Sequence, residues 1–130
     1  MIKFIIFDFY GVLYFTNKDE LNPDILKFMD NNNKKYNFGV ISAIQSDLAG
    51  WLKEKNAQKN FKFIKTTGEL GLPKSDPGLY QMVLASYKLK PSEVLLVDDS
   101  AENLSAAKQA GLLTLRYTQF RSIEEQIKNL

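Results

Sequence analysis

Five polar residues are candidates for chemistry because each stands at the end of a short apolar run or in a loop near one. They are Asp8, Ser42, Lys74, Asp98 and Asp99. Three carboxylates held close together repel one another, so such a group needs a cation or a change in its pKa values. A cluster built only from oxygen ligands suits Mg²⁺, which binds carboxylates, carbonyls and water. A lysine and a hydroxyl beside that metal would suit a bound phosphate group.

The apolar runs predict the strands that would bring these residues together. Residues 4–7 read Phe-Ile-Ile-Phe, which is typical of a strand buried on both faces of a parallel sheet. We expect further strands at 38–41, 61–64, 93–97 and 112–117, with helices between them. This alternation predicts one α/β domain over residues 1–130, with helices on both faces of a parallel sheet of about five strands. The carboxyl ends of parallel strands share one edge, so Asp8, Ser42 and the acidic pair should meet there.

Local signals predict where the connecting segments begin and end. Asn22-Pro23 is typical of a helix N-cap followed by proline at the first helical position. Ser46 or Asp47 is expected to cap the next helix. The segments 14–21 and 68–77 contain turn-forming residues, and we expect both to be loops.

Composition excludes several classes of site and partner. The 130 residues include no cysteine and no histidine, so thiolate metal sites and disulfides are excluded, and acid–base chemistry must use carboxylates, lysine or tyrosine. A net charge of +2 gives no argument for nucleic acid or a membrane surface as a partner. No apolar run approaches the length of a membrane span and the start does not resemble a signal peptide, so we expect a cytoplasmic location.

Four motifs, in this order, resemble those of the haloacid dehalogenase superfamily of hydrolases and phosphatases. They are Asp8-Phe9-Tyr10-Gly11-Val12-Leu13, Val40-Ile41-Ser42, Lys74-Ser75-Asp76-Pro77 and Asp98-Asp99-Ser100. The resemblance covers residues 4–117 and implies a three-layer α/β/α sandwich with a Rossmann-like sheet. Each motif is weak alone, but together they favour this family strongly.

The resemblance implies a catalytic role for three of the candidates. Asp8 would be the nucleophile that forms an acyl phosphate. Ser42 and Lys74 would hold the transferring phosphoryl oxygens, and Lys74 would offset charge on the intermediate. The implied substrate is a small phosphorylated or otherwise activated molecule.

The resemblance also implies a magnesium cofactor. Mg²⁺ would lie between Asp8, the backbone carbonyl of Tyr10 and Asp99, while Asp98 would contribute directly or through water. Tyr10 is expected to contact the substrate as well.

Tyr10 departs from the pattern of the family's phosphatases, which have a second aspartate at this position. That aspartate protonates the leaving group and activates water, whereas a phenol has an unperturbed pKa of about 10 and suits neither task near neutral pH. We expect Tyr10 to pack in place of the carboxylate. The dehalogenase branch has Asp-x-Tyr-Gly here and uses no metal. Three functions therefore stay open: a Mg²⁺-dependent phosphohydrolase, a metal-independent dehalogenase-like hydrolase, and a binding or assembly module that is catalytically impaired.

The spacing of the motifs leaves no room for the cap domain that many family members insert. Residues 14–38 and 67–92 each fit only a loop and one helix, so we expect a core domain with an open site. An open site excludes water poorly unless a large substrate or a partner, such as a second copy, covers it. Tyr14 and Phe15 could form such a contact or belong to the core.

Each candidate also has an ordinary structural interpretation. Asp8 could simply end a strand, and Ser42 could cap a turn or a helix. Lys74 could be a solvated loop residue, and the pair Asp98–Asp99 could cap the following helix. Asn103 could support the site through a hydrogen bond or face solvent.

Overall fold

The computed structural model describes residues 1–44 and 47–130, so Ser46, one of the two expected caps, lies outside the described residues. The elements in chain order are β1 (Phe4–Asp8), β2 (Tyr14–Phe15), β3 (Glu20–Leu21), α1 (Pro23–Asn32), β4 (Asn37–Ser42), α2 (Leu48–Glu54), β5 (Phe61–Thr66), α3 (Thr67–Leu70), α4 (Pro77–Ser86), the 3₁₀ helix η1 (Pro91–Glu93), β6 (Val94–Asp98), α5 (Ala101–Gln109), β7 (Leu113–Arg116) and α6 (Ile123–Lys128).

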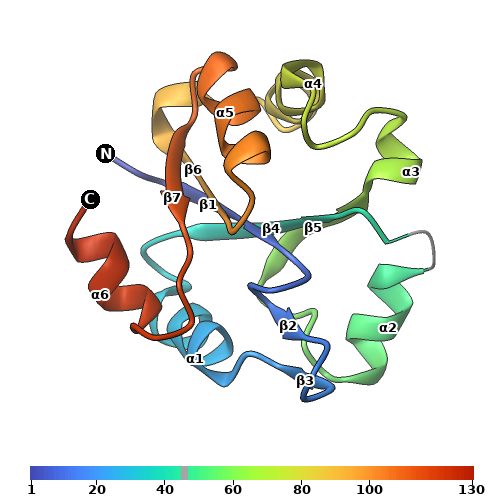
Figure 1. Ribbon diagram of the computed structural model, residues 1–130, viewed down its shortest axis with the longest axis vertical. Helices are drawn as coiled ribbons and strands as arrows, with labels where there is room; N and C mark the ends of the chain where they lie inside the picture. Colours follow the sequence, from blue (N-terminus) through green and yellow to red (C-terminus); the bar gives the residue numbers. More distant parts are fainter. Residues whose placement is uncertain (45–46) are drawn as a thin grey trace.

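The main sheet has the strand order β5-β4-β1-β6-β7, and all of its neighbouring strands run parallel. Helices α4 and α5 cover one face of the sheet, while α1, α2 and α6 lie on the other (Figure 1). The prediction of a parallel α/β fold with helices on both faces is confirmed. The central strand β1 is buried along its whole length, as its unbroken apolar run indicates.

Two apolar clusters fill the space between the sheet and its helices. Alternate residues of β1 serve the two clusters: Ile5 and Phe7 pack toward α1 and α2, whereas Phe4 and Ile6 pack toward α4 and α5. This alternation follows from the two-residue period of a strand. The carboxyl edge of the sheet, where the candidate residues are expected, is therefore supported by an apolar core on both faces of the central strand.

Two segments that were expected to be loops contain short secondary structure. Residues 14–21 form an antiparallel hairpin in which Tyr14 pairs with Leu21 and Phe15 with Glu20. Strands of two residues are too short to show a periodic pattern, which is why the sequence did not indicate them. Helix α3 occupies 67–70 and begins with a capping box formed by Thr66 and Glu69.

The expected helix starts are otherwise confirmed where the structure describes them. The side chain of Asn22 accepts a hydrogen bond from the backbone N–H of Asp24, and Asp47 accepts one from Gly50. Within the described residues, no helix combines the length and apolar character that crossing a bilayer requires.

Candidate active site

The candidate residues meet at the carboxyl edge of the sheet because of strand order. After β1 the chain adds β4 and β5 on one side, and then returns to place β6 and β7 on the other. Open α/β sheets bind ligands in the crevice at such a reversal. Phe7 is paired with Val97 in the register of β1 and β6. The next residue of each strand, Asp8 and Asp98, is therefore placed side by side.

Lys74 joins these two carboxylates. Its ammonium group forms ion pairs with Oδ1 of Asp8 and, at 2.9 Å, with Oδ2 of Asp98. All three side chains are removed from water, with 5% of the Lys74 side chain and 0% of the Asp98 side chain exposed. A buried lysine of this kind is retained only where partners offset its charge. The interpretation of Lys74 as a solvated loop residue is wrong.

Asp8 lies in an environment that disfavours its charge. Burial raises the pKa of Asp8 to about 7; Lys74 acts to lower it, whereas the neighbouring Asp98 and Asp99 act to raise it further. The carboxylates thus carry more negative charge than one lysine balances. A further cation, or a proton, is favoured at this position.

The local sequence around Lys74 aims its side chain at the edge. Asp76 caps α4 by accepting a hydrogen bond from the N–H of Gly78 at 2.8 Å, and Pro77 occupies the first turn of the helix. The buried hydroxyl of Tyr80 donates to the carbonyl oxygen of Lys74 at 2.7 Å. The Lys-Ser-Asp-Pro motif therefore starts a helix and fixes the lysine backbone at the same time.

Asp98 is held by the start of α5. Its Oδ1 accepts from the N–H of Ser100 at 2.9 Å, and its Oδ2 accepts from the side-chain amide of Asn103 at 3.2 Å. Together with Lys74, these donors engage both oxygens of a fully buried carboxylate. Of the two interpretations of Asn103, the structure shows the supporting hydrogen bond.

A tight turn after β1 brings the backbone of Gly11 against Asp99. The carbonyl of Phe9 accepts from the N–H groups of Leu13 and Tyr14, both at 2.9 Å. Gly11 has a φ of +79°, and a methyl group added there would overlap with Oδ2 of Asp99. Glycine is required for both reasons.

Ser42 is fully buried at the end of β4, and its hydroxyl accepts a hydrogen bond from the N–H of Ile44 at 3.1 Å. The structure thus shows the turn contact that the ordinary interpretation expects. The contact uses the oxygen as an acceptor, which leaves the hydroxyl hydrogen to donate to a ligand.

Tyr10 differs from the expectation of a packed side chain. It remains 41% exposed, and its ring contacts Phe9 and Tyr14 only edge-on, with centroids 5.0 and 6.1 Å apart. Tyr10 lies in the turn between β1 and β2, immediately before Gly11, whose φ is +79°. Tyr14 and Phe15 are partly buried and pack against the core.

The three acidic residues fit a metal ion by their geometry and chemistry. One carboxylate oxygen from each of Asp8, Asp98 and Asp99 lies within 4.8 Å of the others, and Asp99 is exposed. Hard divalent cations with oxygen ligands, such as Mg²⁺, match this set and leave room for water. The structure therefore brings together the residues that the sequence singled out for metal binding.

Asn22 and Tyr80 support the site without having been identified as functional from the sequence. The buried amide of Asn22 donates to the carbonyl of Val12 at 2.9 Å and to the hydroxyl of Tyr117 at 2.7 Å. It thereby ties the turn after β1 to the segment after β7. Asn22 was recognisable only as a helix cap and Tyr80 only as an apolar position of a helix, because their partners lie elsewhere in the chain or on the backbone.

The sequence profile of the haloacid dehalogenase-like hydrolases matches residues 15–116. This is well over half of the chain. The chain belongs to the haloacid dehalogenase-like hydrolase family. The match begins after the Asp8 motif, so the position of Asp8 in the family rests on the strand edge and the motif itself.

Solved structures share the fold of this family member across most of its length. An uncharacterized protein from Corynebacterium glutamicum is 25% identical, with a TM-score of 0.74 over 99% of this chain and 92% of the other. A haloacid dehalogenase family enzyme from Bacteroides thetaiotaomicron, crystallised with magnesium and inorganic phosphate, is 15% identical, with a TM-score of 0.80 over 96% and 98%. A 2-haloacid dehalogenase from Pseudomonas syringae is 15% identical, with a TM-score of 0.77 over 90% and 86%. The fold alone does not separate the two chemistries.

Curated relatives match over a shorter stretch. The bifunctional epoxide hydrolase 2 of Rattus norvegicus is 35% identical over 57 residues, and that of Mus musculus is 33% identical over 57 residues. The match spans 44% of this chain but only 10% of either relative. Function must therefore be argued from the site.

Proposed function

We propose that this protein is a Mg²⁺-dependent phosphohydrolase that uses Asp8 as its nucleophile. One observation carries the proposal: Lys74 bridges Asp8 and Asp98 at a strand edge where a third carboxylate, Asp99, lies within ligand distance of both. A lone nucleophile would not need three carboxylates. A phosphate site with a metal does, because charge stabilisation dominates phosphoryl transfer.

The chain's own residues divide the work of a two-step displacement. Lys74 engages Oδ1 of Asp8, which leaves Oδ2 to attack phosphorus. The new bond joins Asp8 to phosphorus, and the bond from phosphorus to the leaving oxygen breaks with its electron pair on that oxygen. Water then attacks the phosphorus, and the bond from phosphorus to the Asp8 oxygen breaks with its electron pair on that oxygen, which restores the carboxylate. The protons of the water pass to phosphate and solvent. Ser42 and Lys74 would hold phosphoryl oxygens throughout.

Asp8, Asp99 and the carbonyl of Tyr10 would hold Mg²⁺, with Asp98 directly or through water. The ion would neutralise charge on the carboxylates and the phosphate. Since Asp98 already accepts from Lys74, Ser100 and Asn103, its main contribution is to orient the lysine.

No carboxylic acid at position 10 is present to protonate the leaving group. General acid–base catalysis is typically worth about 10²–10⁴-fold, and it matters most when the leaving oxygen is strongly basic. Tyr10 therefore favours substrates whose leaving group departs as a weak base, such as aryl or acyl phosphates.

A dehalogenase-like hydrolase is the second candidate, and the Asp8-Phe9-Tyr10-Gly11 motif favours it. Asp8 would attack carbon and expel halide, which needs no proton. The buried Lys74 and the three adjacent carboxylates favour the phosphohydrolase instead, because halide displacement has no use for a cation site. A binding or assembly module would keep the fold with neither activity.

Phosphate release from an aryl phosphate separates these functions. We expect turnover with Mg²⁺, a loss of turnover with chelator, and a loss in Asp8→Asn. Halide release from a haloacid that persists in chelator would identify the dehalogenase. Neither activity in a folded protein would favour the binding module.

A further inference from the structure

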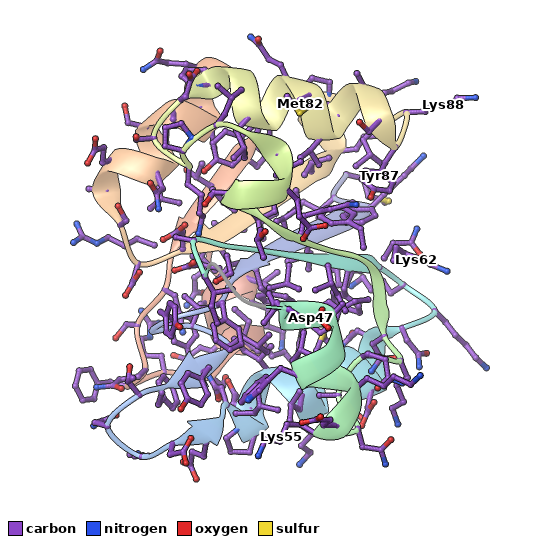
Figure 2. The ribbon with its side chains drawn as sticks, turned by 90° about the vertical axis from the view of Figure 1, so that its right-hand side faces the viewer. Asp47, Lys55, Lys62, Met82, Tyr87 and Lys88 are labelled. Atoms are coloured by element: carbon purple, nitrogen blue, oxygen red, sulfur yellow. The ribbon has the colours of Figure 1, made fainter. Side chains whose placement is uncertain are left out.

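Four aromatic rings pack together beside the turn that follows Asp8. Phe9 is buried, and Tyr14 stacks on it with centroids 5.2 Å apart and planes 9° from parallel. Tyr10 and Trp51 stand nearly perpendicular to Phe9, at 77° and 87°. Trp51 comes from α2, which Figure 2 shows between the labelled residues Asp47 and Lys55. We call Tyr10, Tyr14 and Trp51 the aromatic group.

The side chains of the aromatic group are only partly buried in the core. Tyr10 is 41% exposed, and both Tyr14 and Trp51 are partly exposed. Phe9 covers one face of Tyr14, and Tyr10 and Trp51 stand edge-on to this stacked pair, at 68° and 84° to Tyr14. A planar ring bound against the exposed parts of these side chains would meet them through offset or edge-on contacts. Offset and edge-on contacts of this kind are the favoured arrangements of aromatic rings.

The aromatic group adjoins the turn that follows Asp8. Asp8 is at the strand edge, and Gly11, the residue after Tyr10, lies so near Asp99 that an added methyl group would overlap with it. In-line displacement places the leaving oxygen on the far side of phosphorus from Asp8, away from the sheet. Tyr10 is an exposed side chain in this turn, two residues beyond Asp8.

We propose that the aromatic group binds a planar aromatic leaving group, so that aryl phosphate monoesters are the preferred substrate class. The proposal rests on the phosphohydrolase function above. It explains two features of the site. The site has no carboxylic acid at position 10 because an aryl oxide leaves without one, and it has an aromatic group because the leaving group is an aromatic ring. With Tyr10 in place of a carboxylate, the site lacks an acid that an aryl substrate does not need and gains an aromatic ring that can contact it.

A different ligand for the aromatic group, and a different position for the aryl ring, are both less favoured. An aromatic group can also bind a quaternary ammonium ion, but Lys55 already places its ammonium 5.5 Å from the centre of the Trp51 ring. A choline-type alcohol would also need the missing acid in order to leave. Among the described residues, a cavity of about 350 Å³ is lined by Gly11, Asp99 and Phe120, but not by Asp8, by Lys74 or by any ring of the aromatic group.

Trp51 is the single tryptophan of the chain, so its fluorescence reports on the aromatic group directly. We would titrate the Mg²⁺-loaded protein with phenylphosphonate and with methylphosphonate, neither of which is hydrolysed. Saturable quenching by phenylphosphonate, with little change from methylphosphonate, is the expected result. This readout needs no turnover, so it separates failure of the subsite from failure of the proposed enzyme activity. Absence of quenching by phenylphosphonate would overturn the proposal.

Kinetics provide the second arm. We would compare kcat/KM for an aryl phosphate with that for acetyl phosphate, which also has a good leaving group but no ring. Trp51→Leu should lower the ratio of the two by about two- to tenfold, since an edge-on or offset contact between aromatic rings is worth about 0.5–1.5 kcal/mol. Tyr36→Leu is the matched control, because Tyr36 is also partly exposed, carries Lys35 over its ring at 5.2 Å and precedes the opposite end of β4.

The remaining outcomes also decide the proposal. A ratio that is unchanged in Trp51→Leu contradicts it, provided that thermal unfolding shows the variant to be folded. A ratio that falls in Phe120→Ala instead would place the ring in the cavity and overturn the proposal. Faster turnover of phosphocholine than of the aryl phosphate would do the same.

Discussion

Gly11 and Asp99 lie so close together that a methyl group on Gly11 would overlap with Oδ2 of the Asp99 carboxylate. The contact joins the turn after β1 to the residue after β6, the two strands at the reversal of the sheet. The absence of a side chain on Gly11 leaves room for the exposed carboxylate of Asp99 near the two buried ones. The geometry of the candidate metal site therefore depends on a residue that has no side chain.

Gly11→Ala should cost both stability and metal-dependent activity. The left-handed backbone at φ +79° alone costs an alanine about 1–2 kcal/mol. The overlap with Asp99 adds to this and moves the carboxylate. Gly71→Ala is the matched control, since Gly71 has a φ of +76° with nothing within 4 Å of the added methyl. Equal Mg²⁺ affinity in both variants, measured by calorimetry, would contradict the role of the Gly11 contact.

Lys74→Met should destabilise the metal-free protein more than a surface lysine substitution does. It leaves Asp8 and Asp98 without their shared cation, and losing one partner of a buried ion pair costs about 3–5 kcal/mol. Urea unfolding measures the loss. Lys65→Met is the control, because its ion pair with Glu69 is solvent-accessible and such pairs contribute about 0–1 kcal/mol. We expect Mg²⁺ to restore part of the stability of Lys74→Met, and similar losses in the two variants would contradict the account.

Asp8→Asn should stabilise the metal-free protein, and more so at higher pH. Since burial raises the pKa of Asp8 to about 7, the folded state holds a proton that the unfolded state releases at lower pH. The stability linked to that proton is present below the unfolded pKa and is lost as pH rises through about 7. Thermal unfolding in chelator near pH 5 and near pH 8 should therefore show a larger gain for Asp8→Asn at the higher pH.

Asp30 supplies a control of opposite sign. A hydrogen bond from Asn60 and the nearby Lys59 lower the pKa of Asp30, so its contribution is present at neutral pH and is lost in acid. Asp30→Asn should therefore never gain stability with rising pH. A gain from Asp8→Asn that does not depend on pH would show that Asp8 is not held in the raised-pKa environment.

Tyr10→Asp should extend activity to alkyl phosphates. A carboxyl group at this position can protonate a basic leaving oxygen and then activate water, which is worth on the order of 10²-fold or more. Aryl phosphates should gain nothing from the acid, because their leaving group needs no proton, and should lose the contact that the ring of Tyr10 provides. Tyr10→Asn has a similar size without the acid and should show no gain. An equal gain in both variants would mean that removal of the ring, rather than the acid, matters.

The sequence predicted the sheet and the meeting of its polar residues because both follow from local patterns. Apolar runs identified the main strands, and three of the five runs ended next to Asp8, Ser42 or the acidic pair. Parallel strands then require these ends to share an edge. Lys74 was placed by its motif rather than by a strand.

The supporting contacts could not be predicted in the same way because they join distant segments. The bond from Asn22 to Tyr117 spans 95 residues, and the hydroxyl of Tyr80 bonds to a backbone carbonyl that no side-chain pattern reveals. The aromatic group depends on Trp51 from α2 meeting Tyr14 from the hairpin, and a two-residue strand leaves no periodic signal. Tyr10 is exposed in the turn beside Gly11, and the type of residue at position 10 does not reveal that exposure.

The most direct test of the account is to trap the covalent intermediate. The Mg²⁺-loaded protein would be quenched during turnover of an aryl phosphate and treated with borohydride, which reduces an acyl phosphate to an alcohol. Peptide mass spectrometry should then find homoserine in place of Asp8, and no such product in Asp8→Asn or in protein kept in chelator. Phosphate release with Asp8 unmodified in every quenched sample would contradict a nucleophilic role for Asp8.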